Sequence, residues 1–141
     1  MLYKDLVVWQ KAHALTLKTI KAVNHVDRSY ASEVVVRQLL RAVTSIGANI
    51  AEGYGRHEGK EYTRFLEIAY GPDFVGMPID RHSANEVDNW LNVLNDAKLM
   101  NQAIASELLK DNEEVLKILI TMIRRIRGKG GENRERNKNE Q

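Results

Sequence analysis

The chain contains only two prolines, Pro72 and Pro78, and they lie six residues apart. Proline removes a backbone hydrogen-bond donor and clashes with the preceding helical turn, so its absence elsewhere leaves long stretches free to form helices. In these stretches apolar residues recur at steps of three and four, which is the period of an amphipathic helix. The pattern predicts four helices, over about residues 3–25, 31–52, 60–70 continued by 83–99, and 102–127.

The four predicted helices indicate an all-α fold. A helix of about 25 residues is about 37 Å long, which suits an antiparallel up-down-up-down four-helix bundle with short connections. We expect this bundle to span residues 1–127, with its third helix interrupted by a proline-containing loop near residues 72–82. Residues 128–141 contain no apolar side chain, and we expect them to form a disordered basic tail.

Each predicted helix carries an apolar stripe that we expect to face the core. In the first helix the stripe comprises Leu2, Leu6, Trp9, His13, Leu17 and Ile20. In the second helix it comprises Val35, Leu39, Ala42, Ile46 and Ile50. The third helix contributes Val87, Trp90, Leu91 and Leu94, and the fourth contributes Ile104, Leu108, Val115, Leu119, Met122 and Ile126.

The predicted loop at 72–82 is unusually apolar. It contains Phe74, Val75, Met77 and Ile79. Two interpretations remain open, since these side chains either tuck against the bundle or form an exposed docking loop for a partner. Directly after it, the sequence Ser83-Ala-Asn-Glu86 has the form of a capping box, which restarts a helix.

Residue types that carry chemistry are scarce. The chain has no cysteine, and its four histidines show no spacing typical of metal ligation, so we expect no catalytic residue, metal, cofactor or small-molecule substrate. His13 lies on the apolar stripe, where a core or interface role is favoured over ligation. No run of 18 apolar residues and no signal-peptide pattern is present, so we expect a cytoplasmic protein without a membrane partner.

Charge is distributed unevenly along the chain. Residues 1–57 carry 8 basic and 4 acidic side chains, residues 58–123 carry 6 and 12, and residues 124–141 carry 7 and 3. The net charges are therefore +4, −6 and +4, which give +2 in total. Three interpretations fit this pattern: polyanion binding, association of oppositely charged surfaces of two subunits, or ordinary solvated helix faces.

The second helix has an additional polar line beside its apolar stripe. Gln38, Arg41, Ser45, Asn49 and Glu52 fall within an arc of about 80° at 100° per residue. Small residues are interleaved with this line, and Gly47, which costs about 1 kcal/mol relative to alanine within a helix, indicates close packing. Such a line must satisfy its hydrogen bonds within the protein or across an interface. Gly53 and Gly55 then predict the end of the helix.

The same residues resemble a known family. The segment 41–53, Arg-Ala-x-x-Ser-Ile-x-x-Asn-Ile-Ala-Glu-Gly, and the segment Leu6-Val-Val-Trp-Gln-Lys-Ala12 are similar to bacterial four-helix-bundle proteins of the 23S ribosomal RNA intervening-sequence family. That family is related to the accessory variability proteins of diversity-generating retroelements. The resemblance covers most of residues 3–126 and implies a ring-like homopentamer. In the retroelement branch, it implies binding to a reverse transcriptase and nucleic acid.

The sequence departs from the family pattern at residues 72–82. Family members run from the glycine that matches Gly71 directly into the serine that matches Ser83, so these 11 residues form an insertion. The insertion is either natural or a peptide grafted into an engineered chain. Its removal is expected to restore a continuous third helix.

The leading functional hypothesis is a non-enzymatic homo-oligomer that binds RNA, or a complex such as a reverse transcriptase with its RNA, through basic surfaces. The candidate nucleic-acid contacts are Arg37, Arg41, Arg124, Arg125, Arg127, Lys129, Arg134 and Arg136. The candidate interface motif comprises Trp9, Gln38, Arg41, Ser45, Asn49, Glu52 and Gly53. The alternative is a purely structural protein or an engineered scaffold with an inserted peptide loop and no role in nucleic-acid binding.

Overall fold

The structure, a computed structural model, describes residues 2–55 and 84–139, with side chains in the last helix described through Arg125. A short 3-10 helix, η1 (Tyr3–Asp5), precedes α1 (Val7–Val23) and α2 (Tyr30–Gly55). They are followed by α4 (Ala84–Asp96) and α5 (Gln102–Asn139). The predicted helix at 60–70, the loop at 72–82 with its candidate docking residues, and the Ser83 capping box lie outside the described residues.

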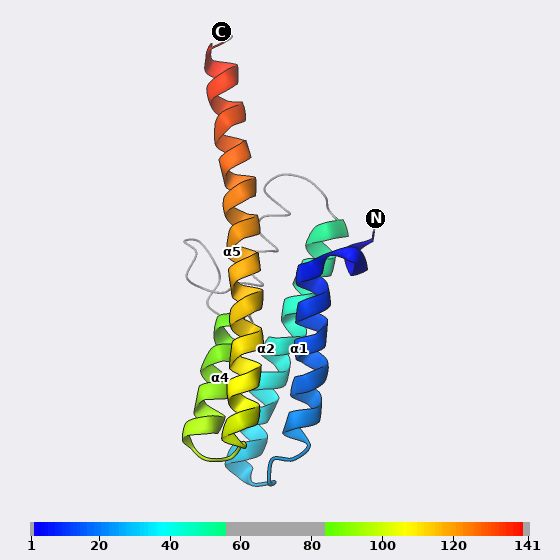
Figure 1. Cartoon of the computed structure of the whole chain (residues 1–141), viewed down its shortest axis with the longest axis vertical. Coiled ribbons are helices and arrows are strands. Elements are labelled where there is room, and N and C mark those ends of the chain that lie inside the picture. Colours follow the sequence, from blue (N-terminus) through cyan, green and yellow to red (C-terminus); the bar gives the residue numbers. More distant parts are fainter. Residues whose placement is uncertain (1, 56–83, 140–141) are drawn as a thin grey trace.

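The helices form an antiparallel four-helix bundle, which confirms the predicted all-α fold (Figure 1). Helix α1 packs against α2, α2 against α4, α4 against α5, and α5 closes the ring against α1. Among these elements, α2 and α5 make no contact, so they lie diagonally across the bundle. The C-terminal half of α5 extends well past the ends of α1 and α4 (Figure 1).

Side-chain caps fix the starts of α2 and α5. The Ser29 hydroxyl accepts a hydrogen bond from the Ser32 amide at 3.1 Å, and the Ser32 hydroxyl accepts one from the Ser29 amide at 2.8 Å. This reciprocal pair satisfies amides that the first turn of α2 leaves without partners. Asn101 caps α5 in the same way, since its side-chain oxygen accepts the Ala103 amide at 2.9 Å.

The core runs along the inner faces of all four helices. Helix α2 contributes Leu39, Ala42, Val43, Ile46 and Ile50, all fully buried, and α5 contributes Ala105, Leu108, Val115, Leu119 and Ile123. Val87, Leu91 and Leu94 of α4 are also fully buried. The predicted stripes of these helices are therefore confirmed in their main part, while Val35, Trp90, Ile104 and Met122 are half-buried at the margin.

The predicted stripe of α1 is wrong except at Leu6 and Trp9, which are half-buried and pack against the core. The buried residues are Val8, Ala12, Leu15, Thr19 and Ala22, whereas Leu2, His13, Leu17 and Ile20 are exposed. The physical reason is that α1 carries two apolar faces, and the smaller side chains of one allow close approach to its neighbours. Its rotation also brings Lys11 and Lys18 to acidic residues of α5, at 2.6 Å from Glu114 and 2.9 Å from Asp111.

The end of α5 also differs from the prediction. The sequence indicated a helix ending near residue 127 and a disordered tail over 128–141, but α5 continues to Asn139. Extending an existing helix avoids the cost of nucleation, and the Glu, Arg and Lys residues of this stretch favour helix. The three glycines at 128, 130 and 131 weaken it by about 1 kcal/mol each relative to alanine. Helix α2 likewise passes the predicted stop at Gly53, which is buried, and is described as helix through Gly55.

Candidate nucleic-acid interface

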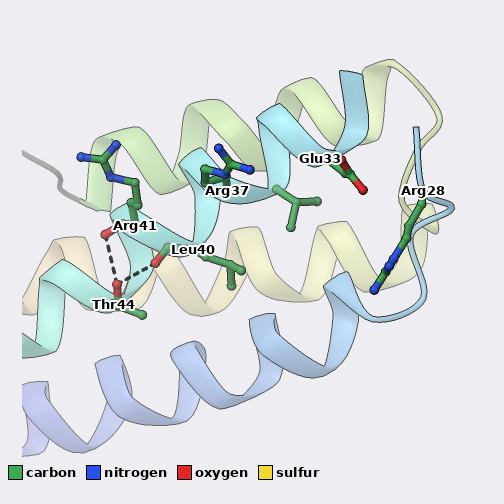
Figure 2. Close-up of a pocket in the computed structure, with 7 residues that line it drawn as sticks. Arg28, Glu33, Arg37, Leu40, Arg41 and Thr44 are labelled. Atoms are coloured by element: carbon green, nitrogen blue, oxygen red, sulfur yellow. Dashed lines mark hydrogen bonds between the residues drawn. The ribbon is translucent and has the colours of Figure 1, made fainter. Parts of the chain in front are cut away.

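Three arginines line one open groove on the outer side of α2 (Figure 2). Arg37 and Arg41 project from successive turns of α2, and Arg28 reaches in from the connection between α1 and α2. The groove has a volume of about 590 Å³. Val36, Leu40 and Thr44 complete its lining along α2, and Glu33 lies toward the end nearest Arg28.

The local sequence explains how these side chains come together. Residues four apart lie on the same helix face, so Arg37 and Arg41 are neighbours on the surface of α2. The Thr44 hydroxyl donates to the Leu40 carbonyl at 2.7 Å, with the Arg41 carbonyl at 3.2 Å (Figure 2). This hydroxyl is thus satisfied by its own helix. Arg28 directly precedes the Ser29–Ser32 cap, which holds the backbone at the start of α2.

The groove is strongly cationic. Its three guanidinium groups face a single carboxylate, that of Glu33, and within residues 2–55 and 84–125 no ion pair or hydrogen bond engages these arginine side chains. The lysines of α1 behave differently, because Lys11 and Lys18 are bound by carboxylates of α5. The basic N-terminal third and acidic middle of the chain thus neutralise each other in part within one molecule, while the groove keeps its charge.

Lys18 shows the strength of the pairing on α1. Its ammonium donates to Asp111 at 2.9 Å and to Glu107 at 3.0 Å. These hydrogen bonds, the one to Asp111 first, raise the pKa of Lys18 above its ordinary value. The side chain is exposed to solvent, so the pair contributes modestly to stability.

The structure separates the candidate contacts into two groups. Arg37 and Arg41 share the groove, whereas Arg124 and Arg125 are exposed on α5, which lies diagonally from α2. The helix of α5 also includes Arg127, Lys129, Arg134 and Arg136, whose side chains lie outside the described part. Arg28 was not among the contacts predicted from the sequence. Its position one residue before Ser29, which caps α2, could have indicated that it lies close to the start of that helix.

The polar line of α2 lies at the margin of the bundle. The Ser45 hydroxyl donates to the Ala42 carbonyl and the Asn49 amide donates to the Ser45 carbonyl, both at 2.8 Å. These two side chains thus bond to the backbone of their own helix. Gln38 is half-buried, while Arg41 and Glu52 are exposed. Trp9, from the same predicted motif, packs beside Gly47 and stacks on His13 with ring centroids 4.7 Å apart.

Within the described part of the chain, no group of three or more His, Asp or Glu side chains is arranged to hold a metal ion. The described helices also include none that is both long and apolar enough to cross a bilayer.

Comparison with known proteins agrees with the fold. The chain is similar to a protein of unknown function from the S23 ribosomal protein family of Bacteroides thetaiotaomicron VPI-5482, whose crystal structure was determined at 1.70 Å resolution. The TM-score is 0.70 and the sequence identity 26%, over 86% of this chain and 98% of the other. Curated proteins give no match. The model of the 23S rRNA-intervening sequence protein family matches residues 4–121, and the chain therefore belongs to that family.

Proposed function

We propose that this protein is a non-enzymatic, cytoplasmic homo-oligomer that binds RNA, alone or in a complex such as a reverse transcriptase with its RNA. The observation that carries the proposal is the groove of α2, which Arg28, Arg37 and Arg41 line without an ion-pair partner among the described residues. Guanidinium groups pair with phosphates in bidentate geometry and remain charged at every physiological pH. Three of them in one groove form a site for a polyanion.

The family supports an RNA ligand over other polyanions. Its name refers to a sequence that intervenes in 23S rRNA. The net charge of the chain is only +2, so binding depends on local concentration of positive charge rather than on the whole surface. The α2 groove and the exposed Arg124 and Arg125 of α5 are two such concentrations.

An assembly of several subunits carries one cationic groove on each subunit. The resemblance to the family implies a homopentamer, in which even weak contacts from single subunits add through avidity. In the described part of one subunit, α1 exposes Leu17 at 49% and Ile20 at 42%. Exposed apolar residues on one helix face favour contact with another subunit.

The assembly is tested by native mass spectrometry of the full chain. We expect one oligomer, and we expect Leu17→Glu with Ile20→Glu to shift the mass toward the monomer with unchanged helical circular dichroism. Val93→Glu, an exposed apolar position at 36% on α4, is the matched control. A monomeric wild-type protein at micromolar concentration would contradict the oligomer.

The alternative is a structural protein or scaffold in which charges serve assembly alone. The ion pairs between α1 and α5 weaken this alternative, because they place opposite charges together inside one subunit. Those charges are then less available to join two subunits. The arginines of the groove have no such role within the described residues.

RNA binding is tested by fluorescence anisotropy with a labelled RNA at several salt concentrations. Three phosphate contacts give a slope of log K against log salt of about −2, so affinity falls about twentyfold between 50 and 200 mM salt. Arg37→Gln with Arg41→Gln should remove most of that slope. The control, Lys110→Gln with Lys117→Gln, removes the same charge from exposed residues of α5, diagonal to the groove. Binding that ignores salt, or equal losses in both double variants, would exclude the groove.

A further inference from the structure

The groove of α2 has an apolar floor between its arginines. Leu40 is half-buried, yet it is not one of the side chains that pack against the core. Val36 lies one turn before it and does contact the core. Leu40 therefore presents apolar surface to the groove for which the fold itself has no evident need.

A second hollow adjoins the groove. It has a volume of about 220 Å³ and shares Arg28, Glu33, Val36 and Leu40 with the groove, while Asn24 and Ser32 add polar groups to its lining. Val23 and Val26, from the end of α1 and the connection that follows, line its far side. The two hollows together combine guanidinium groups with aliphatic side chains, a mixture that phosphate binding alone does not require.

From this arrangement we infer that the groove binds an unpaired RNA strand rather than a duplex, an inference that rests on the proposed function. Duplex RNA stacks its bases inside the helix and presents phosphates and 2′-hydroxyls to a protein. An unpaired strand also exposes the faces of its bases. These faces stack on guanidinium planes and cover apolar side chains.

The positions of the charges fit a strand with both components. Arg37 and Arg41, one helical turn apart, hold phosphates on one side of the apolar floor, and Arg28 closes the other end. Glu33 lies at that end and repels phosphate, but its carboxylate accepts hydrogen bonds from base N–H groups such as the N3–H of uracil. A base edge, not a phosphate, therefore lies beside Glu33. The volume of the groove is that of a small-molecule site, so it holds a short stretch of strand.

The test compares a fluorescent 12-nucleotide oligouridine with an RNA duplex of equal length, both against the full chain at 50 and 200 mM salt. We expect the single strand to bind at least about tenfold more tightly, because base stacking adds to the phosphate contacts. Leu40→Ser should weaken single-strand binding about fivefold or more without changing the salt slope. Val34→Ser, an exposed apolar residue of α2 that is not among those lining the groove, is the matched control and should bind as wild type.

The outcomes distinguish the preference for unpaired RNA from the proposed RNA-binding function itself. Equal affinity for duplex and single strand, with no effect of Leu40→Ser, overturns the preference for unpaired RNA and leaves the RNA-binding function standing. A polyglutamate peptide of equal charge that binds as tightly as the oligouridine also overturns it, because charge alone is then recognised. Absence of salt-dependent binding to both RNAs removes the proposed function, and the inference with it. A circular dichroism spectrum of each variant checks that it is folded.

Discussion

The indole of Trp9 lies directly over Gly47, so that a methyl group built onto this glycine would lie 3.6 Å from the indole nitrogen. That separation is an ordinary van der Waals contact. The glycine lies where α1 and α2 approach each other, but the contact leaves room for a small side chain, so the packing here is looser than the glycine indicated.

Gly47→Ala should consequently stabilise the subunit. Glycine costs about 1 kcal/mol relative to alanine inside a helix, and the added methyl group meets no clash, so we expect the free energy of unfolding to rise by about 0.5–1 kcal/mol. Urea denaturation followed by circular dichroism measures this change. Gly55 is the last described residue of α2, and a methyl group built onto it has no contact within 4 Å among the described residues outside its own helix, so Gly55→Ala should have a smaller effect. If Gly47→Ala instead lowers the free energy of unfolding, the added methyl group must clash with another subunit, because it meets no clash within its own.

Two leucines of α1 test which face of that helix forms the core. Leu15 is 1% exposed and Leu17 is 49% exposed, although the predicted stripe included Leu17 and omitted Leu15. Leu15→Ala should lower the free energy of unfolding by about 2–5 kcal/mol, whereas Leu17→Ala should change it by less than about 0.5 kcal/mol. Equal losses in denaturant would contradict the observed rotation of α1. Any dependence of the Leu17 effect on protein concentration reports on subunit contact.

The contrast between α1 and α2 shows what sequence periodicity can predict. In α2 one face carries Leu39, Ile46 and Ile50, and every large residue of that stripe is buried. In α1 two faces are apolar, and the choice between them depends on partners such as Asp111, 93 residues away along the chain. The apolar period within α1 does not depend on such a distant partner. The prediction from periodicity therefore chose the face of α1 with the larger side chains.

Sequence periodicity was limited in the same way in predicting the residues of the α2 groove. Arg37 and Arg41 were among the contacts predicted from the sequence, and residues four apart do lie on one helix face. Arg28 belongs to a connection, where no period applies, and its place follows from the hydrogen bonds between Ser29 and Ser32. The apolar floor was missed for a different reason: Leu40 lies beside the buried Leu39, and only the packing shows that it is left outside the core.

Lys18 gives a prediction for alkaline pH. Its pKa is raised above the ordinary value of 10.5 by hydrogen bonds to Asp111 and Glu107, so the charged form favours the folded state. The stabilisation is fully present below pH 10.5 and is lost as the pH rises through the higher pKa of the folded protein. The melting temperature of the wild type should exceed that of Lys18→Gln by a constant amount between pH 7 and 10, and the difference should shrink at higher pH. A difference that persists unchanged above that range contradicts the assignment.

Asn112 is a fully buried amide of α5 that links two helices. Its nitrogen donates to the carbonyl of Ala84 at 2.7 Å, while its side-chain oxygen is buried with no partner in the described part of the chain. Asn112→Asp replaces the donor by an acceptor facing that carbonyl and buries a charge, so we expect a loss of at least about 3 kcal/mol. Asn112→Leu removes the unsatisfied oxygen at similar volume but also the donor to the Ala84 carbonyl, so it should cost about 1–2 kcal/mol, less than Asn112→Asp. Urea denaturation of both variants gives the comparison, and a more damaging leucine would mean that the oxygen has an important partner.

Removal of residues 128–141 tests the role of the end of α5. The buried side chains of the described residues end at Ile123, so a chain that stops at Arg127 should keep the melting temperature and the oligomer of the full protein. The removed segment carries Lys129, Arg134, Arg136 and Lys138, and each cation that contacts phosphate contributes about −0.7 to the salt slope for single-stranded RNA. Three glutamates in the segment oppose them, so we expect a loss of affinity of about threefold to tenfold rather than of all binding. Anisotropy at 50 and 200 mM salt measures both quantities. An unchanged slope would show that this end of α5 does not contact RNA and would leave the groove of α2 as the main cationic site.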